Sequence, residues 1–402
     1  MHNELYKPAI VIPAYQRAVA LSELLHSINE ANYPGSAHTL ILSLDGGSGA
    51  DVMQTVEDFN FHHGNKIVVR HDRNLGLKDH IYECCEYSKK YGSVIVLEDD
   101  LYVSPHYYSY SLESLEAYGK SERVAGISLY AQHFNETAQL PFEPMPSTWD
   151  AYFMRLASSW GQVFTHRQWQ LFLEWKNLLT DDRTLALNKL PENIRKWPSS
   201  SWKKEFNLYL NQTERWISYP YKSFTTNRSH HQGRHMMGLE SLFEVPVVQT
   251  SKKNHHFSFP TVKSAEIAYD TFMEACGQVV QRMTGFESEN LELDLYGTKP
   301  MSVLREKKFV ITSKKSGNPI KYYQHYRKPL EANLNHPSDG SNKKEIRILR
   351  LVKPKDIKSR KAVRWAYNIL SVSMGQNRLL TRRFTFSHFF YFLWKKWRVL
   401  KG

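Results

Sequence analysis

Hydrophobic residues follow two different periods along the first hundred residues. A short β-rich run over 9–13 precedes apolar residues spaced three and four apart, at Leu21, Leu24, Leu25 and Ile28. The run predicts a buried strand, and the spacing predicts an amphipathic helix. Further strands are predicted over 39–44, 67–69 and 94–97, with a helix over 77–90. This alternation favours an α/β fold with a parallel sheet and helices on both faces.

Polar side chains follow each of these predicted strands. They are Tyr15 and Arg17, then Asp45, then His71 and Asp72, and finally Glu98, Asp99 and Asp100. In a parallel sheet the carboxyl ends of the strands meet at one edge, and ligands bind there. The sequence has no GxGxxG after its first strand and no GxxxxGK[ST], so it lacks the phosphate cradles of dinucleotide-binding and P-loop proteins.

The acidic triplet Glu98-Asp99-Asp100 is the most informative local feature. Carboxylates gathered at the end of a buried strand repel one another, and a divalent cation relieves that repulsion. The triplet therefore points to a metal and a phosphate-bearing substrate. An acidic turn that caps the next helix is the alternative interpretation.

Four motifs in order resemble a known family. They are AYQR over 14–17, SLDGG over 43–47, GLKDHIY over 76–82 with His80, and VIVLEDDLYVSP over 94–105. They resemble nucleotide-sugar glycosyltransferases with the glycosyltransferase-A (GT-A) fold, specifically the N-acetylglucosaminyltransferase I-like and the bacterial family-2-like surface-polysaccharide transferases. SSWGQVF over 158–164, SYPYKS over 218–223 with Asn227, and DLYG over 294–297 look like the bacterial branch. The resemblance covers about residues 8–300.

The resemblance implies a nucleoside diphosphate sugar, with a UDP-sugar expected, bound over the strand ends. The implied donor contacts are Pro13, Tyr15, Arg17, Asp45, Lys78, His80, Glu98 and Asp99. Asp100 is the implied ligand of Mn²⁺ or Mg²⁺, Asp99 contacts the ribose or sugar, and Glu98 orients both. The metal would neutralise the diphosphate leaving group. Taken alone, Arg17 is typical of a solvated residue at a helix start.

An inverting transfer, which the resemblance also implies, needs a base near the acceptor hydroxyl. The segment WKKEFNLYL over 202–210 offers Glu205 where the family has Asp. Asp181 and Asp182 are the alternative bases, and a surface ion pair with a nearby Lys is the alternative interpretation of Glu205.

Histidines cluster in RSHHQGRH after Asn227, as His230, His231 and His235. The bacterial branch has here a slightly longer loop, with an Asp, that closes over the donor. His235 is our candidate second metal ligand, because imidazole binds Mn²⁺. A phosphate-contacting loop and a solvated turn are the alternatives. His255 and His256 are interpreted as structural.

Composition and length bear on the compartment. The 402 residues are 41% hydrophobic, enough for one large or two smaller cores. The three cysteines have no CxxC spacing, which favours a reducing compartment. Neither a signal-peptide pattern nor an apolar run of about 20 residues occurs, so we expect a cytoplasmic protein without a transmembrane helix.

Charge is unevenly distributed. Residues 303–402 contain 25 Lys and Arg against 5 Asp and Glu, whereas residues 1–302 contain 28 against 35. An apolar stripe with helical spacing ends the chain, at Phe386, Phe389, Phe390, Leu393, Trp394, Trp397 and Leu400. The stripe and the charge predict a helix at an anionic membrane surface. A helix packed on the protein's own core is the alternative.

We therefore expect a GT-A catalytic domain over 1–300, with a nucleotide-sugar-binding half over 1–130 and an acceptor-side half over 131–300. A basic linker over 301–355 and a basic amphipathic helical region over 356–402 would follow. The expected function is a metal-dependent, inverting hexosyl- or N-acetylhexosaminyltransferase of bacterial polysaccharide biosynthesis. Its acceptor would be a lipid-linked or cell-surface glycan, and it would lie at the inner face of the cell membrane.

Two other classes of protein remain as alternatives. A sugar nucleotidyltransferase shares the fold and the metal chemistry, but PAYQRAVAL over 13–21 lacks the Gly-rich basic signature of those enzymes. A nucleic-acid-binding protein could use the basic tail. Its aromatic residues, however, lie on one helical stripe and are not interleaved as stacking platforms, so no nucleic-acid partner is expected.

Overall fold

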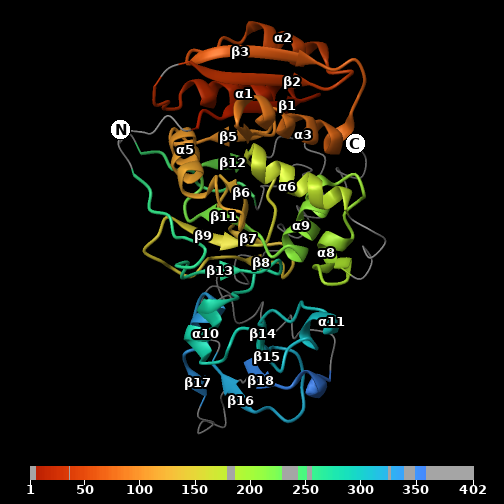
Figure 1. Cartoon of the computed structure of the whole chain (residues 1–402), viewed down its shortest axis with the longest axis vertical. Coiled ribbons are helices and arrows are strands. Elements are labelled where there is room, and N and C mark those ends of the chain that lie inside the picture. The colour runs from red at the N-terminus through yellow and green to blue at the C-terminus, as the bar shows by residue number, and fades with distance from the viewer. Residues whose placement is uncertain are drawn as a thin grey trace, which may run out of the picture. The chain divides into compact units, whose positions relative to one another are not determined.

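The computed structural model describes residues 6–35, 37–178, 186–228, 243–250, 256–324, 327–338 and 349–358. The chain divides into two compact units, 1–230 with 240–289, and 231–239 with 290–402 (Figure 1). The division after residue 289 lies slightly before the domain boundary that the sequence analysis places at 300.

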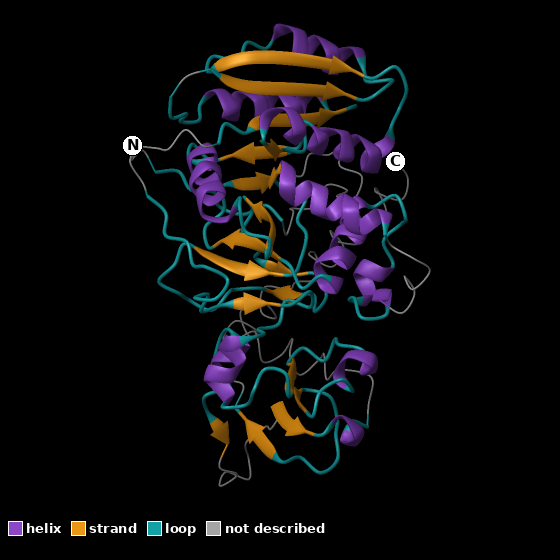
Figure 2. Cartoon of the chain, in the orientation of Figure 1, coloured by secondary structure: helices purple, strands orange, loops and turns teal. Residues whose placement is uncertain are grey.

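The first unit contains a large sheet and helices on both of its faces (Figure 2). Its helices are α1 (Ala18–Asn29), α2 (Ala50–Asp58), α3 (Gly76–Glu86), α4 (Ser88–Tyr91), α5 (Tyr107–Tyr118), α6 (His166–Asn177), α8 (Glu192–Arg195), α9 (Trp202–Gln212) and α10 (Gln278–Thr284). Its strands are β1 (Ala9–Ala14), β2 (His38–Leu44), β3 (Gly64–Arg70), β4 (Ser93–Val96), β5 (Leu101–Val103), β6 (Val124–Ser128), β7 (Phe134–Asn135), β8 (Leu140–Pro141), β9 (Ala151–Met154), β10 (Gln162–Thr165), β11 (Trp216–Pro220), β12 (Thr225–Asn227) and β13 (Ala268–Tyr269).

Within the described residues, nine strands form one mixed sheet in the order β13-β9-β11-β6-β10-β4-β1-β2-β3. Strands β4, β1, β2 and β3 are parallel, as the sequence predicts. Strand β10 lies antiparallel between β4 and β6, which the sequence analysis does not predict. The strands β5 and β12 form a separate antiparallel pair. The predicted α/β fold class is therefore confirmed.

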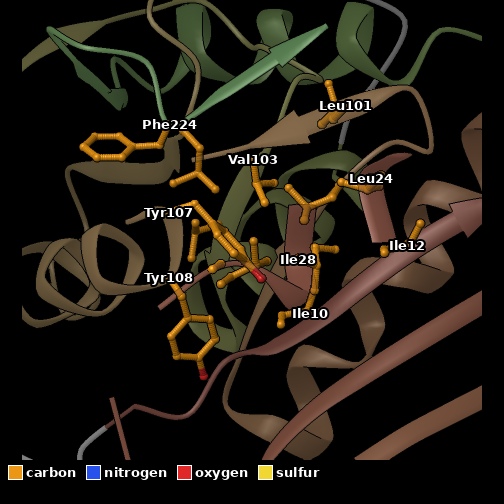
Figure 3. Close-up of a cluster of buried hydrophobic side chains, with 14 of the residues drawn as sticks. Ile10, Ile12, Leu24, Ile28, Leu101, Val103, Tyr107, Tyr108 and Phe224 are labelled. Carbon is orange, nitrogen blue, oxygen red and sulfur yellow. The ribbon is translucent and has the colours of Figure 1, made fainter. Parts of the chain in front are cut away.

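One face of the sheet packs on α1 and α5. All six residues of β1 are buried, which explains why its sequence is a continuous apolar run without alternation. The stripe predicted on α1 contributes Leu24 and Ile28 to a core with Ile10 and Ile12 of β1, and Tyr107 of α5 joins it (Figure 3). The amphipathic period of α1 therefore matches the face that it buries.

The opposite face packs on α6 and α9 through aromatic rings. Phe164 of β10 lies 5.6 Å, between ring centroids, from both Trp169 of α6 and Phe206 of α9. Phe172 of α6 lies 4.9 Å from Phe206 in the same way. Aromatic pairs at these separations add stability beyond their buried area. They fix α9 against β10, next to the end of β4.

The second unit has its own sheet in residues that we expected to be a linker. Its elements are β14 (Leu291–Asp294), α11 (Met301–Leu304), β15 (Phe309–Thr312), β16 (Lys321–Tyr323), β17 (Pro337–Ser338), β18 (Leu349–Val352) and two 3₁₀ turns (Leu330–Asn333 and Pro354–Asp356). The strand order is β14-β15-β18-β16-β17. The linker prediction over 301–355 is therefore corrected.

Buried charges explain why composition hides this sheet. Lys314 is buried, and its Nζ lies 2.9 Å from Oδ2 of the buried Asp294, which also accepts a hydrogen bond from Thr312 at 2.7 Å. Lysines that composition assigns to solvent thus belong to the interior. Of the helical region predicted over 356–402, residues 359–402 lie outside the described residues. In the part of the chain that is described, no helix has the length and apolar character required to cross a bilayer.

Candidate active site

The ends of β1 and β4 meet through Arg17. Its guanidinium lies 2.5 Å from Oδ2 of Asp100 and also contacts Oδ1 of Asp99. Burial lowers the pKa of Arg17, but the carboxylates of Asp99 and Asp100 outweigh burial and hold that pKa above its usual value. The predicted meeting of strand ends is therefore present, and Arg17 supplies the counter-charge to the acids.

The acidic triplet is strongly perturbed. Burial raises the pKa of Glu98, the charge of Asp100 adds to the shift, and Lys203 and Arg17 oppose it. Burial likewise raises the pKa of Asp99 to about 6, against the opposing effect of Arg17. Among the described residues, no side chain hydrogen bonds to Oδ1 of Asp100, which is buried. An acid cluster with one unpaired oxygen suits a cationic ligand.

The carboxylate oxygens of Asp100 are suitable ligands for a divalent cation. Carboxylate oxygen is a preferred ligand of Mg²⁺ and Mn²⁺, and Mg²⁺ typically binds one or two carboxylates with substrate phosphates completing the shell. The described residues contain no group of three His, Cys, Asp or Glu side chains that could hold a metal by themselves. A site completed by a diphosphate needs no such group. His235, the other candidate ligand, lies outside the described residues, as do His230, His231 and His255.

Asp45 connects the end of β2 to the start of α3. Its Oδ1 accepts hydrogen bonds from the backbone N–H of Gly46 at 2.9 Å and of Leu75 at 2.7 Å, and its Oδ2 accepts one from Gly76 at 3.2 Å. The bonds from Leu75 and Gly76 satisfy N–H groups at the start of α3. A Cβ on Gly46 would lie 2.1 Å from the carbonyl carbon of Arg73, so the close approach requires glycine. The predicted contact of Asp45 with the nucleotide-sugar donor is not tested by these bonds and stays a prediction.

His80 is buried beside Asp45. Its Nε2 lies 2.8 Å from Oγ of Ser43, and its Nδ1 lies 4.0 Å from Oδ2 of Asp45. Burial lowers the pKa of His80 to about 4, with the charge of Asp45 opposing and that of His71 reinforcing the shift. The imidazole is therefore neutral at pH 7. The predicted contact of His80 with the nucleotide-sugar donor stays a prediction.

Two of the other predicted donor contacts lie on β1 or just after it. Pro13 is buried in β1 opposite Ser43 of β2. Tyr15 follows the strand, and its side chain is 41% exposed. An exposed aromatic ring at a strand end offers a stacking face to a planar group such as a nucleobase.

Glu205 lies on α9 in a network that joins three helices. Its Oε1 is 2.6 Å from Nζ of Lys78 on α3, its Oε2 accepts a hydrogen bond from Tyr82 at 2.8 Å, and Lys176 of α6 is 3.9 Å away. Burial raises the pKa of Glu205, but the bonds from Lys78 and Tyr82 outweigh burial and lower it. Glu205 is therefore ionised at neutral pH with both oxygens engaged. The alternative bases, Asp181 and Asp182, lie outside the described residues.

Lys203 is a candidate site residue that the sequence analysis misses. Its charge acts on Glu98, and its Nζ lies 5.3 Å from the ring centroid of Trp160 and 5.0 Å from that of Trp197. Cations held over indole faces are attracted by the ring electrons. A lysine next to another lysine on a helix gives no signal of this role, because such pairs are typical of solvated faces.

One family model matches the part of the chain that contains most of the predicted site. Residues 9–169 match the family model described as Glycosyl transferase family 2, and this stretch contains Arg17, Asp45, His80 and the acidic triplet. The match confirms the predicted resemblance to nucleotide-sugar glycosyltransferases with the GT-A fold. Residues 9–169 of this chain are therefore similar to family 2 glycosyltransferases.

Three solved structures illustrate the similarity of the chain to known folds. The crystal structure of Staphylococcus aureus TarS 1–349 in complex with UDP-GlcNAc has 15% identity and a TM-score of 0.37, and the match covers 58% of this chain and 62% of that chain. Mannosyltransferase PcManGT from Pyrobaculum calidifontis in complex with GDP-Man and Mn²⁺ has 12% identity and a TM-score of 0.31, covering 44% and 48% respectively. GalNAc-T7 with UDP, GalNAc and Mn²⁺ has 12% identity and a TM-score of 0.36, covering 55% and 43%.

The chain thus spans less than two thirds of the length of these solved structures. None of the curated proteins matches the sequence.

Proposed function

We propose that the protein is a metal-dependent, inverting glycosyltransferase. It transfers a hexosyl or N-acetylhexosaminyl group from a nucleoside diphosphate sugar, with a UDP-sugar as the expected donor. The supporting observation is Asp100, whose Oδ2 holds Arg17 while its buried Oδ1 has no hydrogen-bond partner in the described part of the chain. A buried carboxylate oxygen without a partner is unfavourable, so a cation bound there would stabilise the site.

The residues around Asp100 bind and orient the donor in this proposal. A divalent Mn²⁺ or Mg²⁺, when bound there, supplies positive charge to the diphosphate leaving group. Arg17 fixes the positions of Asp99 and Asp100 through its two contacts. Asp99 contacts the ribose or the sugar, and the exposed ring of Tyr15 stacks on the base. Asp99 and Asp100 are held before the donor arrives, which reduces the ordering that binding requires.

Glu205 is the base in this proposal. It is ionised at neutral pH because Lys78 and Tyr82 lower its pKa. An ionised carboxylate can accept the proton of the attacking acceptor hydroxyl. Lys78 and Tyr82 each hydrogen bond to one of its oxygens, and each oxygen has a further lone pair that can accept the proton.

The basic tail supports our proposals for the acceptor and for the location of the protein. Residues 303–402 carry 25 Lys and Arg against 5 Asp and Glu, and basic residues are attracted to anionic lipid surfaces. A transferase held at the inner face of a bacterial membrane would meet lipid-linked or cell-surface glycan precursors. This part of the proposal rests on the charge and on the apolar stripe over 386–400.

A thermal-shift panel tests the proposed function. UDP-, GDP-, CMP- and dTDP-sugars are each added with and without Mn²⁺, because a ligand that binds the native state raises the melting temperature. We expect one nucleotide class to stabilise the protein, and more strongly with Mn²⁺. If no sugar nucleotide raises the melting temperature, the proposed function is wrong.

Asp100→Asn tests the metal ligand within the same panel. The variant should lose the Mn²⁺-dependent part of the shift and the transferase activity while the fold persists, because asparagine keeps the shape of the side chain, repulsion within the triplet falls, and Arg17 keeps its contact with Asp99. Asp58→Asn is the matched control, since Asp58 is exposed at the end of α2 and should leave the Mn²⁺ response unchanged. An Asp100→Asn protein with full activity would refute the assignment.

A further inference from the structure

Gln162 lies at the same edge of the sheet as the acidic triplet. It is the first residue of β10 and stands opposite Val96, the last residue of β4, and opposite Ser128, the last residue of β6. Glu98 follows two residues after Val96. Because β10 is antiparallel to its neighbours, its first residue lies where theirs end.

The side chain of Gln162 faces the helical layer of α6 and α9. Val163 belongs to the core on the α1 and α5 face, and successive side chains along a strand alternate between faces. Phe164, which shares the face of Gln162, packs on Phe206 of α9. One turn earlier on α9, Lys203 lies over Trp160, two residues before Gln162. The two contacts on either side place Gln162 opposite the start of α9.

The amide of Gln162 has no hydrogen-bond partner among the described residues. The residue is 2% exposed, and neither its Oε1 nor its Nε2 bonds to a described group. Buried side-chain polar groups are nearly always paired, and an unpaired one bears its full desolvation penalty. Asp100 has an unpaired buried oxygen at the same edge. Two such groups at one edge of the sheet indicate a ligand that supplies donors and acceptors.

The strand order indicates which part of a ligand this is. Three residues are predicted to contact the nucleotide. Arg17 follows β1, Asp45 follows β2, and His80 lies on α3. Strands β1 and β2 lie on one side of β4 in the sheet, whereas β10 lies on the other side. With the diphosphate at the acidic triplet, the donor extends away from its nucleotide toward β10. The group at that end of the donor is the sugar.

We propose that the side-chain amide of Gln162 binds the transferred sugar and determines which sugar the enzyme accepts. A primary amide donates two hydrogen bonds and accepts through its carbonyl oxygen, which complements neighbouring hydroxyls or an acetamido group. A site built to hydrogen bond such a group discriminates strongly against an analogue that lacks it or presents it in another direction. This inference rests on the proposed function.

The test compares Gln162→Met with wild type in the full-length protein. Calorimetric titration with Mn²⁺ measures the affinity for UDP, UDP-glucose, UDP-galactose, UDP-GlcNAc and UDP-GalNAc, or for the same sugars on the nucleotide that the thermal-shift panel selects. We expect Gln162→Met to reduce the preference between the best sugar and its epimer by about tenfold to a hundredfold. The affinity for the nucleoside diphosphate without sugar should stay within about twofold, because that part lies on the other side of β4.

Gln168→Met is the matched control. Gln168 is also buried, but its amide donates to the backbone oxygens of Tyr118 and Val124, so Gln168→Met should lower the melting temperature and leave the sugar preference unchanged. Gln162→Met should not lower the melting temperature of the ligand-free protein, since methionine removes an unpaired amide. A melting temperature that falls as in Gln168→Met, or an unchanged sugar preference, overturns the role of Gln162.

The outcomes separate this inference from the proposed function. If the wild type binds no sugar nucleotide, the proposed function is wrong and the inference falls with it. If the wild type binds one and Gln162→Met keeps the wild-type preference between the best sugar and its epimer, only the role of Gln162 is wrong.

Discussion

The buried His80 makes the stability of the first unit dependent on pH. Its pKa is about 4 in the folded protein and 6.5 in the unfolded chain, so the unfolded state binds the proton more tightly. The stability contribution of the neutral imidazole is therefore fully present above pH 6.5 and is lost as the pH falls toward 4. Linkage between these two pKa values gives a loss of about 2 kcal/mol at pH 5.

His80→Gln isolates this contribution. Glutamine does not titrate in this range and can still hydrogen bond to Ser43. Asp99, whose raised pKa favours the fold as the pH falls, contributes to the pH dependence of both proteins, so the difference between the two proteins reports mainly on the imidazole. We expect the wild type to lose about 2 kcal/mol more than His80→Gln between pH 7.5 and pH 5.

Urea unfolding followed by tryptophan fluorescence measures this difference. Seven of the ten tryptophans lie within 149–216 and none lies within 290–358, so the signal reports largely on the first unit. His62→Gln is the control, since its side chain is exposed and its pH dependence should follow the wild type. Equal losses of stability in the wild type and His80→Gln would refute the reasoning, because they would mean that burial does not oppose the protonation of His80.

Three further predictions concern the base and the tail. Glu205→Gln should reduce turnover by about 10²-fold or more with little change in donor affinity, and the same loss in Asp181→Asn or Asp182→Asn instead would move the base there. Lys78→Met should raise the pKa of Glu205, so the acidic limb of the pH–rate profile should move to higher pH; an unmoved limb would argue against Glu205 as the base. Truncation after Thr381 should abolish sedimentation with anionic vesicles and leave nucleotide binding intact, whereas a truncated protein that melts early would place this segment on the protein's own core.

Local periodicity was sufficient to predict the parallel half of the sheet. The stripe of α1 and the apolar run of β1 each match the face or faces that they bury, so the pattern carries the fold directly. The contact of Arg17 with Asp99 and Asp100 also follows from strand order, since the ends of parallel strands meet at one edge. The stripe and the apolar run depend on residues close together in sequence, whereas the Arg17 contacts span more than 80 residues and follow from the parallel order of the strands.

The second unit and Lys203 could not be predicted in this way. The strands β15 and β18 are each four residues long. The composition predicts that the lysines between them are solvated, but Lys314 forms a buried ion pair with Asp294. Lys203 gains its position only because Phe206 fixes α9 against β10, far away in sequence. Both features depend on tertiary contacts, which override local composition.

The direction of β10 explains why the sequence pattern does not reveal Gln162 as a site residue. In the parallel strands, residues at the site edge follow the strand, so a search for polar side chains after apolar runs finds Arg17, Asp45 and Glu98. In an antiparallel strand the same edge lies at its first residue, so Gln162 reaches it as the strand begins. A search after strands therefore finds the proposed nucleotide and metal contacts and passes over the proposed sugar contact. If Gln162 binds the sugar, antiparallel strands next to a parallel site should be searched at their first residues.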